Sequence, residues 1–151
     1  MEPSTLDSQV CFALHAAART AVNAYRAELD KLNVTYTQYV TLLTLFEQDG
    51  QTVSELGARL LLDSGTLSPL LKRMQVLGLV ERRRDADDER RVSVHLTEAG
   101  RAMRPRIASM QQAMGCSLQL SEPELVLLRE LATKFARQAT PHQSSDKEIH
   151  S

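Results

Sequence analysis

The sequence lacks any long apolar run: no uninterrupted segment approaches the ~20 residues that a membrane-spanning helix needs. Its first residues, MEPSTLDSQ, are polar and acidic, and they do not show the basic and then apolar pattern of a signal peptide. We therefore expect a cytoplasmic protein. The sequence also contains no internal repeat and no glycine-rich phosphate loop.

Cysteine is scarce, because the chain has only Cys11 and Cys116, which lie far apart in the sequence. Two cysteines are too few for a structural zinc site, and the four histidines show no ligand spacing near them. In a cytoplasmic chain this pattern indicates a reactive pair or two buried bystanders rather than a permanent disulfide. The sequence predicts neither a metal nor a cofactor.

The net charge of −1 conceals an uneven distribution of charged residues. Residues 72–106 contain ten basic and six acidic side chains, whereas the rest of the chain is acidic on balance. A chain so close to neutral does not bind polyanions indiscriminately, but a local basic segment can contact phosphates. A solvated charged loop is the alternative interpretation of this segment.

Helical patterns dominate, and capping boxes mark several helix starts at 35–38, 52–55 and 121–124. Thr97 is a further plausible cap. We expect helices at 6–32, 36–48, 53–60, 64–78, 98–117 and 122–138, with short strands at 79–83 and 91–96. The polar residues from 139 onward are expected to be disordered.

The helices predicted at 53–60 and 64–78, joined by a short turn, form a helix-turn-helix pattern. The second helix has small polar residues at its start and an apolar stripe formed by Leu67, Leu70, Leu71, Met74 and Leu77. This layout is typical of a recognition helix, whose N-terminal part enters the major groove. Pro69 removes one backbone hydrogen bond if the helix starts at Ser64, but it is tolerated if Thr66 is the cap.

The two predicted strands form a hairpin, the wing, in which arginines surround an acidic turn at 85–89. An arginine at the tip of a wing can enter a narrow minor groove. The acidic residues either moderate repulsion between the arginines or hold one of them in place, and we favour a contact in which Asp88 supports Arg90. The predicted DNA-binding residues are Ser64, Thr66, Ser68, Lys72, Arg73, Arg84, Asp88 and Arg90.

The segment 53–100, with Asp88-Glu-Arg90 followed by a strand and LTEAG, resembles the MarR family of winged helix-turn-helix regulators. The resemblance covers about residues 6–137. It implies a mostly α fold with a small β wing, and a dimer whose interface is formed by the N- and C-terminal helices. We therefore expect a dimerisation and sensor helix at 1–34, a DNA-binding core at 35–97, dimerisation helices at 98–138 and a tail at 139–151.

The first helix carries a heptad-like apolar stripe that includes Cys11. By itself this pattern favours a packing helix on which Cys11 is a small buried hydrophobe. However, LDSQVCFAL, Tyr25, LNVTYTQY and LLLDSGTLSPLLKRM resemble the organic hydroperoxide resistance regulators (OhrR), a branch of the MarR family. The resemblance implies that Cys11 is the sensing cysteine and that Tyr25 and Tyr36 donate hydrogen bonds to it. It also implies that Cys116 forms a disulfide with the Cys11 of the partner.

Cys11 and Tyr25 lie on the same predicted helix, and at a rise of ~1.5 Å per residue they are ~21 Å apart. If the two side chains touch, the tyrosine therefore comes from the other subunit. This places the predicted sensor at a dimer interface.

These features predict a repressor that binds a pseudo-palindromic operator and releases it when an organic hydroperoxide oxidises Cys11. The first alternative is a MarR-type repressor that responds to a small aromatic ligand and has inert cysteines. The second is an enzyme, a thiol peroxidase, against which the wing and the recognition helix argue. We predict that the chain is not an enzyme.

Overall fold

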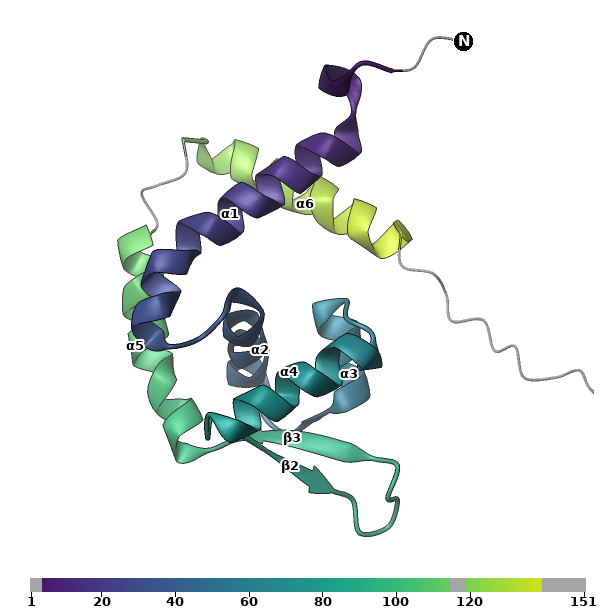
Figure 1. The fold of residues 1–151 in the computed structure, drawn as a ribbon, viewed down its shortest axis with the longest axis vertical. Helices are drawn as coiled ribbons and strands as arrows, with labels where there is room; N and C mark the ends of the chain where they lie inside the picture. The colour runs from purple at the N-terminus through teal and green to yellow at the C-terminus, as the bar shows by residue number, and fades with distance from the viewer. Residues whose placement is uncertain (1–3, 115–118, 140–151) are drawn as a thin grey trace, which may run out of the picture. The chain divides into compact units, whose positions relative to one another are not determined.

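A computed structural model describes residues 4–114 and 119–139 (Figure 1). The chain divides into two units, residues 1–118 and 119–151. The first unit contains a 3-10 turn (Leu6–Ser8), α1 (Val10–Leu32), α2 (Tyr36–Glu47), β1 (Gln51–Thr52), α3 (Val53–Leu60), α4 (Ser64–Val76), β2 (Val80–Arg84), β3 (Val92–Leu96) and α5 (Glu98–Met114). The second unit contains α6 (Glu122–Ala139). The predicted mostly α fold with a small β wing is confirmed.

Side-chain caps start the central helices where the sequence predicted. The hydroxyl of Thr35 accepts from the backbone of Gln38, whose side chain accepts in return from the backbone of Thr35, and Thr52 and Glu55 form the same arrangement at α3. The hydroxyl of Thr97 accepts from the Gly100 backbone at 3.0 Å at the start of α5. These caps satisfy N–H groups that have no partner within the helix.

The predicted first helix, 6–32, is wrong at its N-terminal end, because Gln9 adopts an extended conformation that separates the 3-10 turn from α1. The hydroxyl of Ser8 donates to the Thr5 carbonyl at 2.8 Å. A local side-chain bond of this kind competes with the helical pattern. The helix itself is continuous from Val10 to Leu32.

Helices α3 and α4 form the predicted helix-turn-helix. Leu61 ends α3 in the left-handed region at φ 54°, and the N–H of Leu62 donates to the Gly57 carbonyl at 3.0 Å. A Cβ atom at Gly57 would lie 2.9 Å from the Leu62 carbonyl oxygen, so the turn needs glycine there. Asp63, which the sequence analysis did not identify as a cap, accepts from the Thr66 N–H at 2.7 Å and starts α4.

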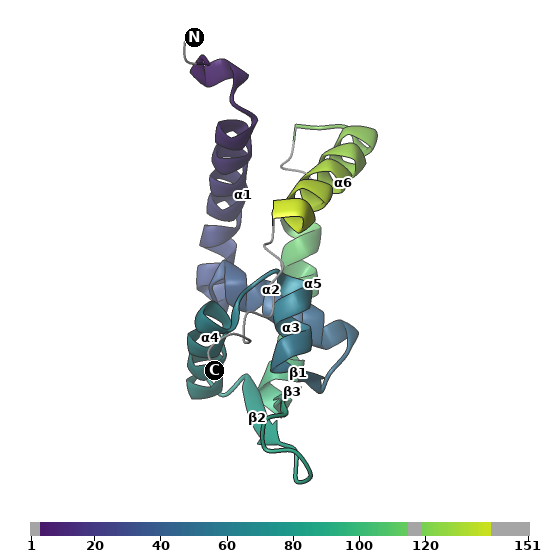
Figure 2. The same ribbon diagram turned by 90° about the vertical axis from the view of Figure 1, so that its right-hand side faces the viewer.

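The sheet has the order β1-β3-β2, and both pairs of neighbours are antiparallel. Val80 pairs with Leu96 and Arg84 with Val92, and the hairpin of β2 and β3 extends beyond the helices (Figure 2). Strand β1 was not predicted, because it has two residues and exists only through its pairing with β3.

The core of the first unit lies between α2, α3, α4, α5 and the sheet. Its most deeply buried side chains include Leu42, Leu45, Leu56, Leu67, Leu71, Met74, Val80, Val94 and Ile107. Since these residues come from every element of the helix-turn-helix and the wing, one core fixes the DNA-binding parts relative to each other. Within the described residues, no helix is both long enough and apolar enough to cross a membrane.

Candidate DNA-binding face and thiol site

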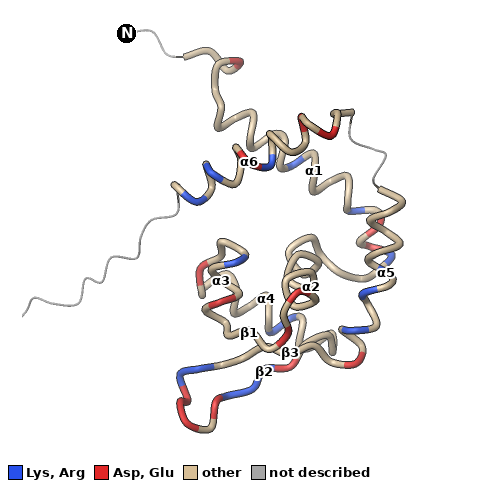
Figure 3. The backbone as a smooth tube through the Cα atoms, turned by 180° about the vertical axis from the view of Figure 1, so that it is seen from behind, with Lys and Arg blue, Asp and Glu red and all other residues tan. Residues whose placement is uncertain are grey.

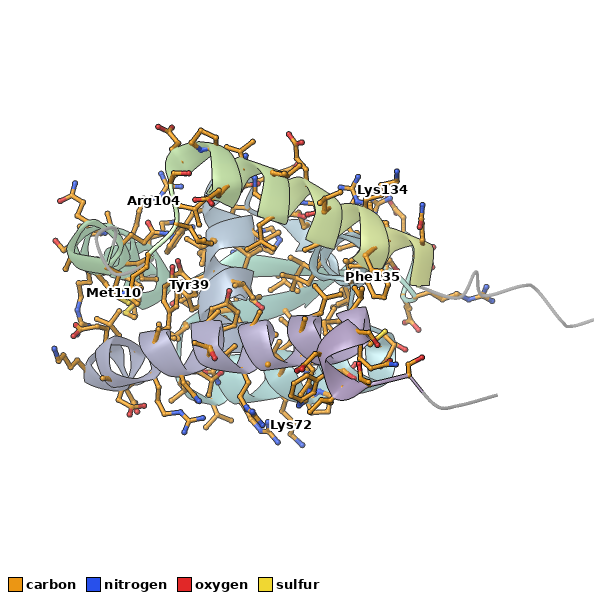
Figure 4. The ribbon with its side chains drawn as sticks, turned by 90° about the horizontal axis from the view of Figure 1, so that it is seen from above. Tyr39, Lys72, Arg104, Met110, Lys134 and Phe135 are labelled. Carbon is orange, nitrogen blue, oxygen red and sulfur yellow. The ribbon has the colours of Figure 1, made fainter. Side chains whose placement is uncertain are left out.

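Helix α4 presents its polar residues on one exposed face. Ser64, Thr66, Ser68, Lys72 and Arg73 are all exposed, and Lys72 extends away from the ribbon in Figure 4. The opposite face is buried through the predicted Leu67, Leu70, Leu71 and Met74. The helix is therefore fixed by its apolar side, while its small polar and basic side chains face outward.

Two details of α4 differ from the simplest expectation. The helix starts at Ser64, so Pro69 lies inside it, and the Gly65 carbonyl lacks the N–H that another residue would supply. Leu77, which we predicted as part of the buried stripe, is 40 % exposed. The helix ends at Val76, and Gly78 follows in the left-handed region at φ 72°, so the helical periodicity does not continue to Leu77.

The turn of the wing is organised by aspartates that bind backbone N–H groups. Asp88 accepts from the backbone N–H of Arg90 at 3.0 Å, and Asp85 accepts from that of Asp87 at 3.0 Å. Asp88 thus supports the main chain at Arg90 rather than its guanidinium. Among the described residues, the guanidinium groups of Arg84 and Arg90 form no ion pair, so they are available to an anionic partner.

Arginine positions lie on β2 and just before β3, on either side of an acidic tip (Figure 3). Two of the arginines are held by the protein: Arg82 donates to the Gln75 side chain of α4 at 3.0 Å, and Arg83 pairs with Glu81. The Arg82 bond ties the wing to the recognition helix. This bond therefore holds Arg82 beside α4.

A groove of about 580 Å³ runs between the start of α3, Ser68 of α4 and the wing. It brings together the predicted residues Ser68, Asp88 and Arg90, and its remaining lining comes from residues 52–55, Arg82, Arg91 and Val92. The structure thus unites residues of the recognition helix and of the wing in one concave surface.

Helix α5 and Asp49 anchor the base of the wing, which the sequence analysis did not predict. The Asp49 carboxylate accepts from the Leu96 backbone N–H at 2.8 Å and lies 3.6 Å from the Arg101 guanidinium. A Cβ atom at Gly100 would lie 2.1 Å from the carbonyl oxygen of Leu79, so only glycine fits where α5 crosses the start of β2. No sequence pattern revealed Asp49, because its partners lie far along the chain.

The thiol of Cys11 is free and exposed near the start of α1. Its apolar neighbours are exposed as well: Val10 is 66 % and Phe12 44 % accessible. Along the predicted stripe, Leu14, Val22 and Tyr25 are half-buried. Full burial is reached only at Leu29, which is 2 % exposed. The N-terminal part of α1 therefore presents an exposed thiol beside exposed apolar side chains.

The tyrosines predicted for the thiol site lie in contact with each other. The ring centroids of Tyr25 and Tyr36 are 5.6 Å apart in an edge-to-face arrangement, and Tyr39 lies 5.6 Å from Tyr25 and 5.8 Å from Tyr36. We call these three residues the tyrosine cluster. Tyr25 and Cys11 belong to the same continuous helix, so the cluster is remote from the thiol of its own chain.

Tyr39 was missed by the sequence analysis, although it lies one helical turn after Tyr36 and so on the same face of α2. It is 4 % exposed, and its hydroxyl accepts from the Gln111 side chain of α5 at 2.8 Å. Burial raises the pKa of Tyr39, the Gln111 bond opposes this, and the hydroxyl groups of Tyr25 and Tyr36 add to the rise.

Burial also raises the pKa of Tyr36, and the neighbouring Tyr25 adds to this effect. Tyr36 and Tyr39 therefore keep their protons throughout the neutral range and can act as hydrogen-bond donors. The remaining predicted thiol residue, Cys116, lies outside the described residues.

A pocket of about 380 Å³ adjoins the tyrosine cluster. Tyr36 lines it together with Val22, Arg26 and Asp30 of α1, and with Leu29, Val34, Thr35 and Thr37. The pocket is open beside the Tyr36 ring, so this tyrosine is accessible from outside the chain while Tyr39 is enclosed.

Helix α6, taken by itself, carries a row of exposed apolar side chains, namely Val126, Leu127, Leu128, Leu131 and Phe135. Among them, Leu127, Leu131 and Phe135 recur at the spacing of successive helical turns. Charged residues such as Arg129, Glu130 and Lys134 occupy other positions of the helix. Such an amphipathic helix is suited to bury its apolar side against another chain.

The three-stranded sheet with its wing hairpin, the helix-turn-helix and the exposed polar face of α4 define a winged helix-turn-helix protein. A model of the family described as transcriptional regulator SarA/Rot matches residues 24–107, and the chain belongs to this family of transcriptional regulators. The prediction that it is not an enzyme agrees with this family and its named relatives.

Two curated relatives link the chain to known regulators. It is 44 % identical over 118 residues to the organic hydroperoxide resistance transcriptional regulator of Bacillus subtilis, covering 78 % of this chain and 80 % of that protein. It is 48 % identical over 114 residues to the HTH-type transcriptional regulator TtmR of Methylorubrum extorquens, covering 76 % of this chain. The match spans only 58 % of the length of TtmR.

Solved structures share the fold. Reduced AbfR bound to DNA has a TM-score of 0.77 at 30 % identity, covering 88 % of this chain and 94 % of that one, and disulfide-formed AbfR has a TM-score of 0.66 at 31 % identity, covering 88 % and 91 %. AbfR is a protein of Staphylococcus epidermidis. A mutant MarR from E. coli complexed with operator DNA has a TM-score of 0.77 at 26 % identity, covering 87 % and 99 %. The predicted resemblance to MarR-type regulators of the OhrR kind is confirmed.

Proposed function

We propose that this chain is a dimeric repressor that senses organic hydroperoxides through Cys11. The observation that carries the proposal is the contact between Tyr25 and Tyr36, the two tyrosines that the OhrR resemblance assigns to the sensing thiol. Phenol hydroxyl groups held together in this way can donate two hydrogen bonds to one thiolate. Such donors stabilise the anion, which is the nucleophilic form of cysteine.

In the proposed reaction, the Cys11 thiolate attacks one oxygen of the hydroperoxide and the O–O bond breaks. The sulfur becomes a sulfenic acid, and the other oxygen leaves as an alcohol after taking up a proton. The thiol of the partner subunit's Cys116 then attacks the sulfenic sulfur. A disulfide forms and water is released, so the peroxide is reduced and the two thiols are oxidised.

The proposed thiol site requires a dimer, because α1 is too long for Cys11 and Tyr25 of one chain to meet. Cys11 and Tyr25 are separated along one helix by ~21 Å, so the tyrosine cluster that serves a given thiol comes from the other subunit. The exposed apolar side chains near Cys11 and along α6 supply surface for the interface. We accordingly assign dimerisation to residues 1–34 and 98–138, and DNA binding to residues 35–97.

For operator binding, we propose that the exposed N-terminal part of α4 enters the major groove and that the wing reaches the adjacent minor groove. Ser64, Thr66 and Ser68 would then face base edges, and Lys72, Arg73 and Arg84 would face phosphates. Arg90, whose guanidinium has no acidic partner in the described chain, is suited to a narrow minor groove. A twofold dimer predicts a pseudo-palindromic operator.

Operator binding titrated with cumene hydroperoxide tests the sensing mechanism. The wild type should release DNA and form a covalent dimer on a non-reducing gel. Cys11→Ser should keep binding DNA in the presence of peroxide, and Cys116→Ser should fail to form the covalent dimer. Release of DNA by oxidised Cys11→Ser would refute the assignment of the sensor, and a covalent dimer in Cys116→Ser would refute that of the second cysteine.

A second candidate function follows from the pocket beside Tyr36. Its volume of about 380 Å³ lies within the range for small-molecule sites, and its lining combines apolar side chains with Arg26, Asp30 and Tyr36. These features would suit a small aromatic ligand. In a repressor of this kind, the Cys11→Ser variant would respond to the ligand as well as the wild type does. This outcome distinguishes it from the peroxide sensor.

A further inference from the structure

The tyrosine cluster is connected to α5 by a hydrogen bond that the proposed reaction does not use. Gln111 donates its side-chain N–H to the hydroxyl oxygen of Tyr39 at 2.8 Å. The bond joins α2 to α5, across residues that lie far apart in the sequence. Figure 4 shows Tyr39 between α1 and α5, near Met110.

Tyr39 contacts both other tyrosines of the cluster and can therefore restrict the orientation of their rings. Its ring packs against Tyr25 at 5.6 Å and against Tyr36 at 5.8 Å, and it is the most deeply buried of the three. Packed rings cannot shift independently, because protein interiors leave little free volume. The orientation of Tyr39 therefore sets the orientation of the two accessible tyrosines.

The bond from Gln111 also leaves the proton of Tyr39 for another partner. A phenol hydroxyl has one proton to donate and lone pairs that accept. Since the Tyr39 oxygen accepts from the Gln111 side chain, its own proton is left for a partner other than Gln111. A donor that itself receives a hydrogen bond becomes polarised and donates more strongly.

We propose that Tyr39, held by Gln111, is a positioning residue for the thiol site: the bond from α5 fixes Tyr39, and Tyr39 fixes the hydroxyl groups of Tyr25 and Tyr36. This inference rests on the proposed peroxide-sensing function.

The test compares Tyr39→Phe, which keeps the ring, with Gln111→Leu, which keeps the approximate size of the side chain. For each, the second-order rate of Cys11 oxidation by cumene hydroperoxide is measured against pH in the full-length reduced dimer. Each substitution should slow oxidation by about 3- to 10-fold, the effect of losing one neutral hydrogen bond, and should move the pH profile to higher pH. The double variant should be no slower than either single variant, because one bond is lost in all three.

Gln112→Leu is the matched control, since Gln112 is an exposed glutamine on the same helix. It should react as the wild type does. Operator affinity of the reduced variants and their thermal unfolding show whether the fold is retained. Wild-type rates and pH profiles for both Tyr39→Phe and Gln111→Leu would overturn the proposal, as would equal slowing by Gln112→Leu.

Two further variants separate this inference from the proposed function. If Cys11→Ser still responds to peroxide, the sensing function fails, and the positioning role fails with it. If Cys11→Ser is unresponsive and Tyr25→Phe is slow, while Tyr39→Phe and Gln111→Leu remain fast, only the positioning role is overturned.

Discussion

The winged-helix core and the terminal helices differ in how far their apolar side chains are buried. In the core, Leu42 and Leu71 have no accessible surface, whereas Leu131 of α6 and Val10 of α1 are 57 % and 66 % exposed. The core is therefore complete within one chain. The terminal segments carry apolar surface that a single chain leaves in contact with water, which is the physical basis for assigning them to a dimer interface.

The largest expected effect is on the stability of the core. Leu42→Ala should lower the free energy of unfolding by about 2–5 kcal/mol, because it removes buried apolar surface and leaves a cavity. Urea unfolding measures this loss. Leu127→Ala on α6 is the matched control, and its effect should depend on protein concentration. A concentration-independent loss of similar size in Leu127→Ala would contradict the distinction between the two regions.

Self-association should depend on the exposed apolar side chains of α6 and not on those of the core. Leu131→Glu places a charge on the apolar side of α6 and should weaken the dimer about 10- to 100-fold, since a buried carboxylate without a partner is costly. Sedimentation velocity over a range of concentrations measures the change. Lys134→Glu, which alters charge on the same helix, serves as the comparison, and an unchanged dimer in Leu131→Glu would exclude this part of α6 from the interface.

On the core side, Arg90→Ala should weaken operator binding by about 10-fold and reduce its dependence on salt, because the wing loses one cation. Fluorescence anisotropy at several salt concentrations provides both values. Arg129→Ala removes an arginine from α6 and should leave binding unchanged. Equal losses in the two variants would place the DNA contacts outside the wing.

The smallest effect concerns the helix caps. Thr52→Ala should destabilise the protein by about 1 kcal/mol through loss of the α3 cap. The backbone N–H and hydroxyl of Thr52 lower the pKa of Glu55. Because the folded pKa is depressed, this stabilisation is present above the unfolded pKa and is lost as the pH falls through the folded value.

Glu124 forms the corresponding contact in α6, where the hydroxyl and backbone N–H of Ser121 lower its pKa. Because the lowered pKa of Glu55 makes core stability depend on pH, Glu55→Gln should remove a small loss in the free energy of unfolding at acidic pH. Glu124→Gln should leave core unfolding unaltered, and chemical denaturation between acidic and neutral pH compares the two variants.

Local patterns in the sequence were sufficient to predict much of the fold. The bounds of α3 agree with the predicted 53–60, because Thr52 and Glu55 form a capping box that is contained within a few residues. The buried face of α4 followed from helical periodicity. Errors occurred where a local conformation interrupts the pattern, as at Gln9 and Leu77.

Features that depend on distant residues could not be predicted in this way. Strand β1 exists only by pairing with β3, and the Asp49 contacts join a loop to β3 and α5. At the thiol site, the resemblance supplied Tyr25 and Tyr36, but the Tyr39–Gln111 bond joins α2 to α5 and leaves no trace in the local sequence.

The tyrosine cluster also gives the protein a built-in spectroscopic probe. The chain contains no tryptophan and only three tyrosines, and all three belong to the cluster. Its near-ultraviolet absorption and intrinsic emission therefore originate almost entirely from this one place. Changes in the surroundings of the cluster, at α1 and the start of α2, should therefore be observable optically in the unlabelled protein.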